Sequence, residues 1–148
     1  MQFARWLHLL AVVVWVGGMF FAYMALRPAA QALPPPQRLP LLAAALSHFV
    51  AWVAAAVAIL VGSGIAMIML LGGMRAVGVH VHVMIGLGLL MILLYGHLVA
   101  SSLKRLRAAV AANDWPSGGA AMTMVRRLVG VNLVLGLVTI TVAVLGRG

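Results

Sequence analysis

Long apolar runs dominate the chain, and charged residues interrupt them at only a few places. The fixed charges leave four uncharged stretches, at 6–26, 39–74, 76–103 and 128–146. A helix that spans a bilayer needs about 20 apolar residues, so each stretch can supply one span. The strict alternation typical of membrane barrel strands is absent from the sequence. The pattern predicts an all-α integral membrane four-helix bundle with helices at about 6–26, 41–71, 79–103 and 127–146.

The four predicted helices account for nearly the whole chain, so we expect a single transmembrane domain over 1–148 with up-down-up-down topology. Gly72 and Gly73 are expected to end the second helix, and the charged segments 27–40 and 104–126 are expected to be loops. The first apolar stretch exceeds the roughly 7–15 residues of a signal-peptide core. We therefore interpret it as a span rather than a cleaved leader.

Composition agrees with a membrane location and excludes several kinds of chemistry. Hydrophobic residues make up 66% of the chain and charged residues 7%, against about 25% charged in soluble domains. Asp114 is the single acid, which excludes catalysis by paired carboxylates. Cysteine is absent, which excludes disulfides, thiolate nucleophiles and iron–sulfur clusters.

The net charge of +9 reflects membrane topology once the positions of the charges are considered. Seven of the ten basic residues fall in the two long connections: Arg27, Arg38, Lys104, Arg105, Arg107, Arg126 and Arg127. The opposite side holds Arg5, Arg75 and Arg147. The positive-inside rule then places both termini on the outer, periplasmic side of a bacterial-type inner membrane. The basic residues would contact lipid headgroups, and nucleic acid is not an expected partner.

The histidines are the main candidates for function, because polar side chains inside a membrane are costly. At a rise of about 1.5 Å per residue, His8 and His82 lie about 12–13 Å toward the outer side of their helix midpoints. His48 and His97 lie about 9–12 Å toward the inner side. Each layer offers two imidazoles from two helices, as six-coordinate haem b requires. The sequence thus predicts haem b at His8 with His82, and a second haem at His97 with His48.

Further residues are suited to complete such haem sites: Trp15, Gly86, Asn132, Arg5 and Arg75. Trp15 shares a helix face with His8, and Gly86 leaves room for a flat macrocycle one turn from His82. Asn132 lies at the depth of His97 and could hydrogen-bond its ring. The two arginines could pair with haem propionates. The expected role is transmembrane electron transfer or oxidation of a membrane-soluble reductant. The electron donor and the electron acceptor are not identified by the sequence.

A copper site at the outer mouth is the alternative, because imidazole and thioether ligands select Cu(I). Its candidate ligands are His8, His80, His82, Met67, Met69, Met74 and Met84. Residues two apart on a helix point about 200° apart, so His80 and His82 could chelate one ion only if the helix began between them. Methionine also fills gaps in bundles. A structural or assembly subunit without a cofactor is the third hypothesis.

Small residues recur at every fourth position of the second helix, at Ala54, Ala58, Gly62 and Ala66. Such stripes let helices approach closely. They would serve packing within the bundle or a homodimer face.

Two segments resemble known membrane-protein families. They are WLHLLAVVVWVGGMFF (6–21) and HVHVMIGLGLLMILLYGHLVASSLKRL (80–106). Both are similar to segments of the CopD-like and HemJ-like small membrane proteins, and the resemblance covers most of the chain. CopD-like membership implies copper uptake or resistance. HemJ-like membership implies haem b and protoporphyrinogen oxidation, with the family's first-helix histidine at His8. The lysine that HemJ-like proteins carry near the start of the third helix is absent here, and His82 lies close to that place.

Overall fold

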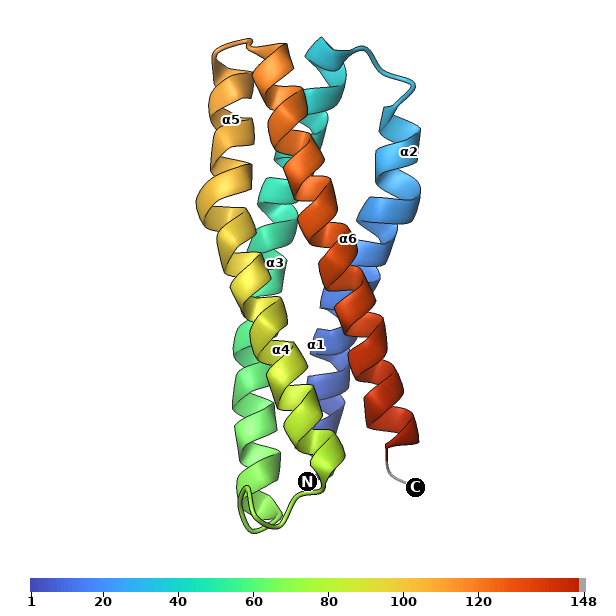
Figure 1. The fold of residues 1–148 in the computed structure, drawn as a ribbon, viewed down its shortest axis with the longest axis vertical. Helices are drawn as coiled ribbons and strands as arrows, with labels where there is room; N and C mark the ends of the chain where they lie inside the picture. Colours follow the sequence, from blue (N-terminus) through green and yellow to red (C-terminus); the bar gives the residue numbers. More distant parts are fainter. Residues whose placement is uncertain (147–148) are drawn as a thin grey trace.

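The computed structural model describes residues 1–146, and every regular element in this range is a helix (Figure 1). The elements in order are α1 (Gln2–Phe21), η1 (Ala22–Leu26), α2 (Arg27–Ala30), α3 (Pro35–Leu70), α4 (Val79–His97), η2 (Leu98–Ser102), α5 (Leu103–Ala111) and α6 (Trp115–Leu145). The segments η1 and η2 are π-helical turns that join α-helices without a break. Arg147, which the charge argument assigns to the outer side, lies beyond the described residues.

Four continuous helical segments are long and apolar enough to cross a membrane: Gln2–Ala30, Pro35–Leu70, Val79–Ala111 and Trp115–Leu145. They run alternately up and down, so the start of α1 and the end of α6 lie at the same end of the bundle (Figure 1). We call this the terminal end, and the opposite end, where α2 joins α3 and α5 joins α6, the basic end. The predicted all-α bundle of four long apolar helices is confirmed.

The helices extend farther toward the basic end than the sequence predicted. Most of 27–40 and 104–126, expected to be loops, is helical, and the connections shrink to 31–34 and 112–114. Pro35 opens α3 at a first-turn position, where a missing N–H costs nothing. In α5 the charged residues stand between buried Leu103 and Leu106, so the helix is amphipathic rather than interrupted. Charge marks the limit of the apolar span and not the end of the helix.

The connection between α3 and α4 agrees with the expected glycine break. Helix α3 ends at Leu70, and Gly72 and Gly73 follow with φ angles of 97° and 93°. Glycine adopts this left-handed region without steric cost. The chain therefore turns sharply before α4 begins at Val79.

The bundle is built from two tightly packed helix pairs, α1 with α3 and α4 with α6. Helix α5 continues α4 and packs against both α6 and α3. Helices α1 and α4 therefore occupy opposite corners of the bundle. Close crossings rely on glycine: a Cβ at Gly136 would lie 2.9 Å from Val16, and one at Gly118 would lie 3.0 Å from Leu39.

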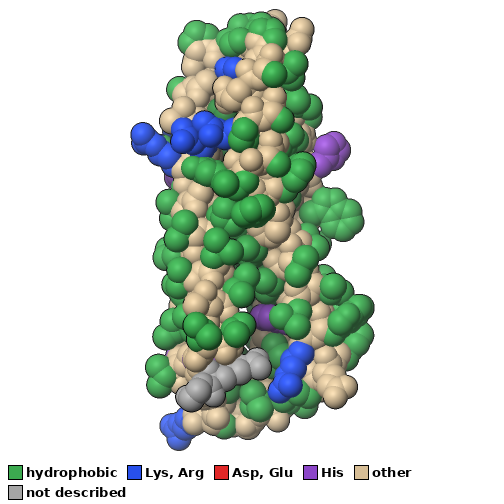
Figure 2. All heavy atoms as spheres, turned by 90° about the vertical axis from the view of Figure 1, so that its right-hand side faces the viewer, with side chains coloured by type: hydrophobic (Ala, Val, Ile, Leu, Met, Phe, Trp, Pro, Cys, Tyr) green, Lys and Arg blue, Asp and Glu red, His purple; other side chains and the backbone are tan. Residues whose placement is uncertain are grey.

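The core occupies the middle and the basic end of the molecule. Val125, Leu103 and Leu106 are fully buried there. Toward the terminal end burial stops: among the described residues, α4 has no buried residue before Met91 and α6 has none after Gly136. Figure 2 shows a hollow in the surface near this end, with a histidine side chain in it. The helices are therefore loosely packed at the terminal end.

The small-residue stripe of α3 does not line the core. Ala54, Ala58 and Gly62 are exposed, and a Cβ added at Gly62 would contact nothing. Packing within this bundle is therefore not their role. The homodimer face remains a prediction.

Candidate functional site

His8 is held between α1 and α3 by a hydrogen bond across the helix pair. Its Nδ1 lies 2.8 Å from Oγ of Ser63, which is itself buried. The Ser63 hydroxyl donates its single hydrogen to the carbonyl of Ile59, at 2.6 Å. When the hydroxyl donates to this carbonyl, Ser63 Oγ accepts from His8, so that Nδ1 carries the ring proton and Nε2 keeps its lone pair. A histidine whose other ring nitrogen is bonded in this way has the usual arrangement of a metal ligand.

His82 shows the same arrangement in a more exposed place. Its Nδ1 lies 3.2 Å from the carbonyl oxygen of Gly78, the residue that precedes α4. A carbonyl can only accept, so Nδ1 donates and the neutral ring again offers Nε2. His8 and His82 thus stand on helices at opposite corners of the bundle, both near the terminal end, and each has its Nδ1 within hydrogen-bond distance of an oxygen.

His80 occupies a different side of α4 from His82. It is half-buried, and its Cβ lies 2.7 Å from where a Cβ at Gly146 would stand, at the end of α6. Its ring lies against Gly78, whose added Cβ would be 2.9 Å from Nδ1. Helix α4 begins at Val79, before both histidines, so the condition for joint chelation by His80 and His82 is not met.

The four methionines named as candidate copper ligands fall into two classes. Met67 and Met84 are half-buried, whereas Met69 and Met74 are 73% and 44% exposed. Met67 follows Ser63 by one helical turn and therefore lies on the face of α3 that contacts His8. Met84 follows His80 by one turn on α4. Each of the two helix pairs thus carries one half-buried histidine and one half-buried methionine, which are His8 with Met67 and His80 with Met84.

The inner layer of candidate ligands is not brought together in the same way. His48 and His97 are both exposed. The Asn132 amide donates to the carbonyl of Met91, at 3.2 Å, and not to His97. Its Oδ1 is buried and has no hydrogen-bond partner among the described residues.

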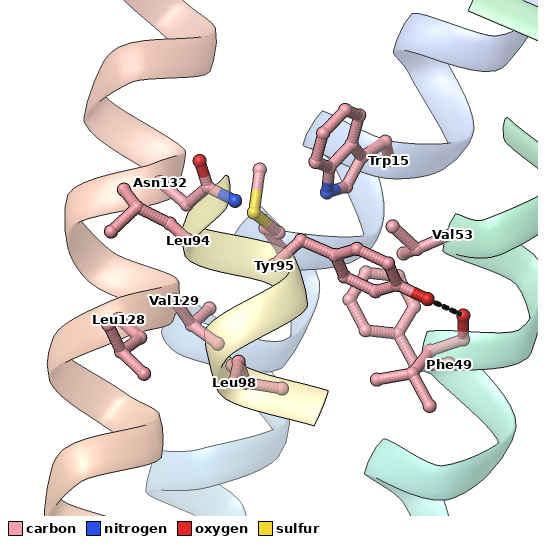
Figure 3. Close-up of a pocket in the computed structure, with 11 residues that line it drawn as sticks. Trp15, Phe49, Val53, Leu94, Tyr95, Leu98, Leu128, Val129 and Asn132 are labelled. Carbon is pink, nitrogen blue, oxygen red and sulfur yellow. Dashed lines mark hydrogen bonds between the residues drawn. The ribbon is translucent and has the colours of Figure 1, made fainter. Parts of the chain in front are cut away.

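A small cavity of about 20 Å³ lies in the centre of the bundle, and Trp15, Tyr95 and Asn132 provide its polar groups. Trp15 packs edge-on against Tyr95 at 6.2 Å between ring centroids, and Tyr95 donates to the Val50 carbonyl at 2.7 Å. Figure 3 shows the nitrogens of Trp15 and Asn132 pointing toward each other across this space. A space of this size holds about one water molecule. It is too small for a porphyrin.

The remaining candidates lie on the surface of that end. Arg5, Arg75 and Gly86 are exposed, and a Cβ at Gly86 would contact nothing. Within residues 1–146, no three residues of the His, Cys, Asp and Glu types are gathered to hold a metal ion. A metal at the terminal end would therefore need methionine among its ligands, or only two histidines.

Sequence reasoning missed Ser63 and Tyr95. Ser63 is polar within an apolar span, but serine satisfies itself by bonding to its own helix, so its presence alone is a weak signal. The partner of its oxygen is 55 residues away in the chain. Tyr95 likewise bonds across helices, to a backbone group that carries no sequence signal.

The fold and site define a membrane protein with four apolar helices that presents histidine and methionine at one loosely packed end. The chain belongs to the copper resistance protein D (CopD) family, whose model matches residues 43–145. This confirms the resemblance to CopD-like proteins. His48, His80, His82 and His97 fall inside the matched residues, and His8 lies outside them. Neither the curated proteins nor the solved structures include a match to this chain.

Proposed function

We propose that this protein handles copper in the membrane and binds Cu(I) as its cargo at the terminal end. Family membership supports copper, and the observation that carries the site is the His8–Ser63 hydrogen bond, which leaves Nε2 of His8 as a ligand atom. Met67, one turn from Ser63 on the same face, would supply a thioether. Imidazole and thioether together favour Cu(I) over harder ions.

The facing helix pair offers further ligands for the same ion. His80 and Met84 lie one turn apart on α4 and are both half-buried. The loose packing of the terminal end would let the two pairs approach around a cation. His82, Met69 and Met74 are more exposed and would serve capture from the aqueous side.

Copper content and affinity of the purified protein test this proposal. Cu(I) is added anaerobically, and affinity is measured by competition with a chromogenic chelator. We expect His8→Ala and Met67→Leu each to weaken binding by at least tenfold. Met124→Leu, which removes an exposed thioether of α6 toward the basic end, is the matched control and should bind as the wild type does. Unchanged affinity in His8→Ala would overturn the proposed site.

Haem b is a second candidate function, favoured by the matching Nδ1 hydrogen bonds of His8 and His82 at opposite corners of the bundle. These two residues would hold the iron, and Arg5 and Arg75, exposed at the same end, would pair with the propionates. Bound haem would supply one-electron transfer. The second haem, between His48 and His97, remains a prediction.

An absorption spectrum separates the two functions. A Soret band with sharp α-bands on dithionite reduction would establish haem, and its loss in His82→Ala but not in His80→Ala would assign the ligand. A colourless protein that binds stoichiometric Cu(I) would exclude haem and leave copper as the function.

We also infer that the whole chain forms one domain in a bacterial-type inner membrane, with the terminal end on the periplasmic side. The support is the charge distribution, since seven of the ten basic residues lie at the basic end. The copper site would then face the compartment from which copper enters the cell.

A further inference from the structure

A shallow groove crosses the surface of the molecule near the basic end, between η1, α2, α3 and α6. Its walls are apolar and include Leu26, Leu42, Met122 and Val125. Its floor is set by Tyr23, whose ring lies 3.0 Å from where a Cβ at Gly130 would stand. Glycine at this position therefore lets η1 sit close against α6.

Two arginines line the same groove from different helices. Arg27 opens α2 and is half-buried, and Arg126 lies on α6. Arg27 directly follows the apolar stretch 6–26, and Arg126 shortly precedes the apolar stretch 128–146. Both guanidinium groups therefore lie where the apolar spans end, which is the depth of lipid headgroups.

The charges of these two arginines are not balanced by the protein. The single acid of the chain, Asp114, accepts a hydrogen bond from the backbone at the start of α6. Arg38 and Arg107 are bonded to the Leu33 carbonyl and to Ser47. Among the described residues, neither Arg27 nor Arg126 has such a bond. Arg126 is exposed and Arg27 is half-buried, and a half-buried cation such as Arg27 is costly without a partner unless an anion compensates it.

We propose that this groove is a binding site for an anionic phospholipid. The phosphate would lie between Arg27 and Arg126, and an acyl chain would lie along Leu26, Leu42 and Met122. Guanidinium groups bind phosphate oxygens through charge-assisted hydrogen bonds. Basic pockets between membrane helices bind anionic headgroups in this way. The site is at the opposite end from the proposed copper ligands and does not depend on them.

Lipid titration of the detergent-solubilised protein tests the site. Native mass spectrometry would compare phosphatidylglycerol with phosphatidylcholine of the same acyl chains. We expect tighter binding of phosphatidylglycerol, and a loss of about 30-fold in its affinity for the variant R27Q/R126Q, from about 1 kcal/mol per arginine. The matched control is K104Q/R105Q, which removes two exposed charges of α5 at the same end and should retain the wild-type affinity.

Two further arms make the result decisive. Inorganic phosphate at millimolar concentration should not displace the lipid, since it lacks the acyl chain. Met122→Trp, which fills the groove without altering charge, should also weaken phosphatidylglycerol binding. Equal binding of the two lipids, or wild-type affinity in R27Q/R126Q, would overturn the proposal. Displacement by phosphate would show an anion site rather than a lipid site.

Discussion

At the scale of single residues, the most informative feature is a serine that fixes the chemistry of a histidine. The Ser63 Oγ lies 2.6 Å from the Ile59 carbonyl of its own helix and 2.8 Å from Nδ1 of His8, so it can accept from His8 while donating to the backbone of α3. Metal affinity in such sites depends on the residues that orient the ligand as well as on the ligand. Ser63 is thus a positioning residue for the proposed copper site.

Ser63→Ala tests this role without removing a ligand atom. We expect Cu(I) affinity to fall by about 10- to 100-fold, the usual effect of losing such a partner, because Nδ1 and Nε2 then compete for the proton. Competition with a Cu(I) chelator gives the value. Ser47→Ala, which removes a half-buried serine of α3 nearer the basic end, should leave Cu(I) affinity unchanged. Equal affinities for all three proteins would show that the hydrogen bond is merely structural.

Tyr95 is a second residue whose role was visible only in the structure. Its hydroxyl donates to the Val50 carbonyl and joins α4 to α3 beside Trp15. Tyr95→Phe should lower the free energy of unfolding by about 0.6 kcal/mol, and by less than about 1.7, as measured for hydrogen bonds between membrane helices. Unfolding in mixed micelles measures this difference. Tyr23→Phe serves as the comparison and should have a smaller effect, since no hydrogen bond of its hydroxyl is present among the described residues.

At the scale of elements, hydropathy was sufficient to predict four helices but not where they end. The helix α5 shows why: Lys104, Arg105 and Arg107 are exposed while Leu103 and Leu106 are buried, so charge and helix coexist. Likewise, Pro35 begins a helix although the proline run 34–36 suggested a loop. Helix geometry predicts how far along its helix each histidine lies. It does not predict whether the side chain points into the bundle or out of it, because the rotation of a helix depends on packing between segments far apart in the chain.

The start of α6 gives a prediction about pH. Hydrogen bonding by Ser117, first through its side chain and then through its backbone N–H, lowers the pKa of the Asp114 carboxyl below its ordinary value. The stabilisation is therefore present above the ordinary carboxyl pKa, about 3.9. It is lost as the pH falls through the lowered pKa of the folded state. The thermal unfolding temperature should therefore decrease as the pH is lowered from neutral to acidic values.

Two substitutions separate the cap from the charge. Asp114→Asn keeps a good capping residue, so it should unfold near the wild-type temperature at neutral pH but lack the acid-dependent decrease. Asp114→Ala should unfold at a lower temperature at neutral pH. If Asp114→Asn retained the full pH dependence, another group would be responsible for it.

At the scale of the whole molecule, packing is graded from one end to the other. The core fills the centre and the basic end, whereas the terminal end has few close contacts between its helix pairs. Figure 2 shows the larger cluster of Lys and Arg side chains toward the basic end of the face in view, with separate basic side chains at the terminal end. Firm packing at the basic end and looser packing at the terminal end would suit a protein that binds an ion at the terminal end.

The orientation of this gradient can be measured by cysteine labelling, because the chain contains no cysteine of its own. Ala76→Cys lies in the α3–α4 connection at the terminal end, and Ala112→Cys lies after α5 at the basic end. On intact cells, a membrane-impermeant maleimide should label position 76 and should label position 112 only after the membrane is opened. The reverse pattern would show that the terminal end faces the cytoplasm.

The π-helical turns η1 and η2 change the directions in which side chains point at the two ends of the same long helix. A π turn closes its hydrogen bonds one residue later than an α turn, so each acts as a single-residue insertion within a continuous helix. In α1–η1–α2 and in α4–η2–α5, the side chains beyond the insertion are therefore out of phase with those before it. The direction in which Arg27 points relative to His8, and Arg107 relative to His82, is therefore offset from that of an uninterrupted α-helix. Helices α3 and α6 have no such turn, so only two of the four long helices present differently phased faces at the two ends of the bundle.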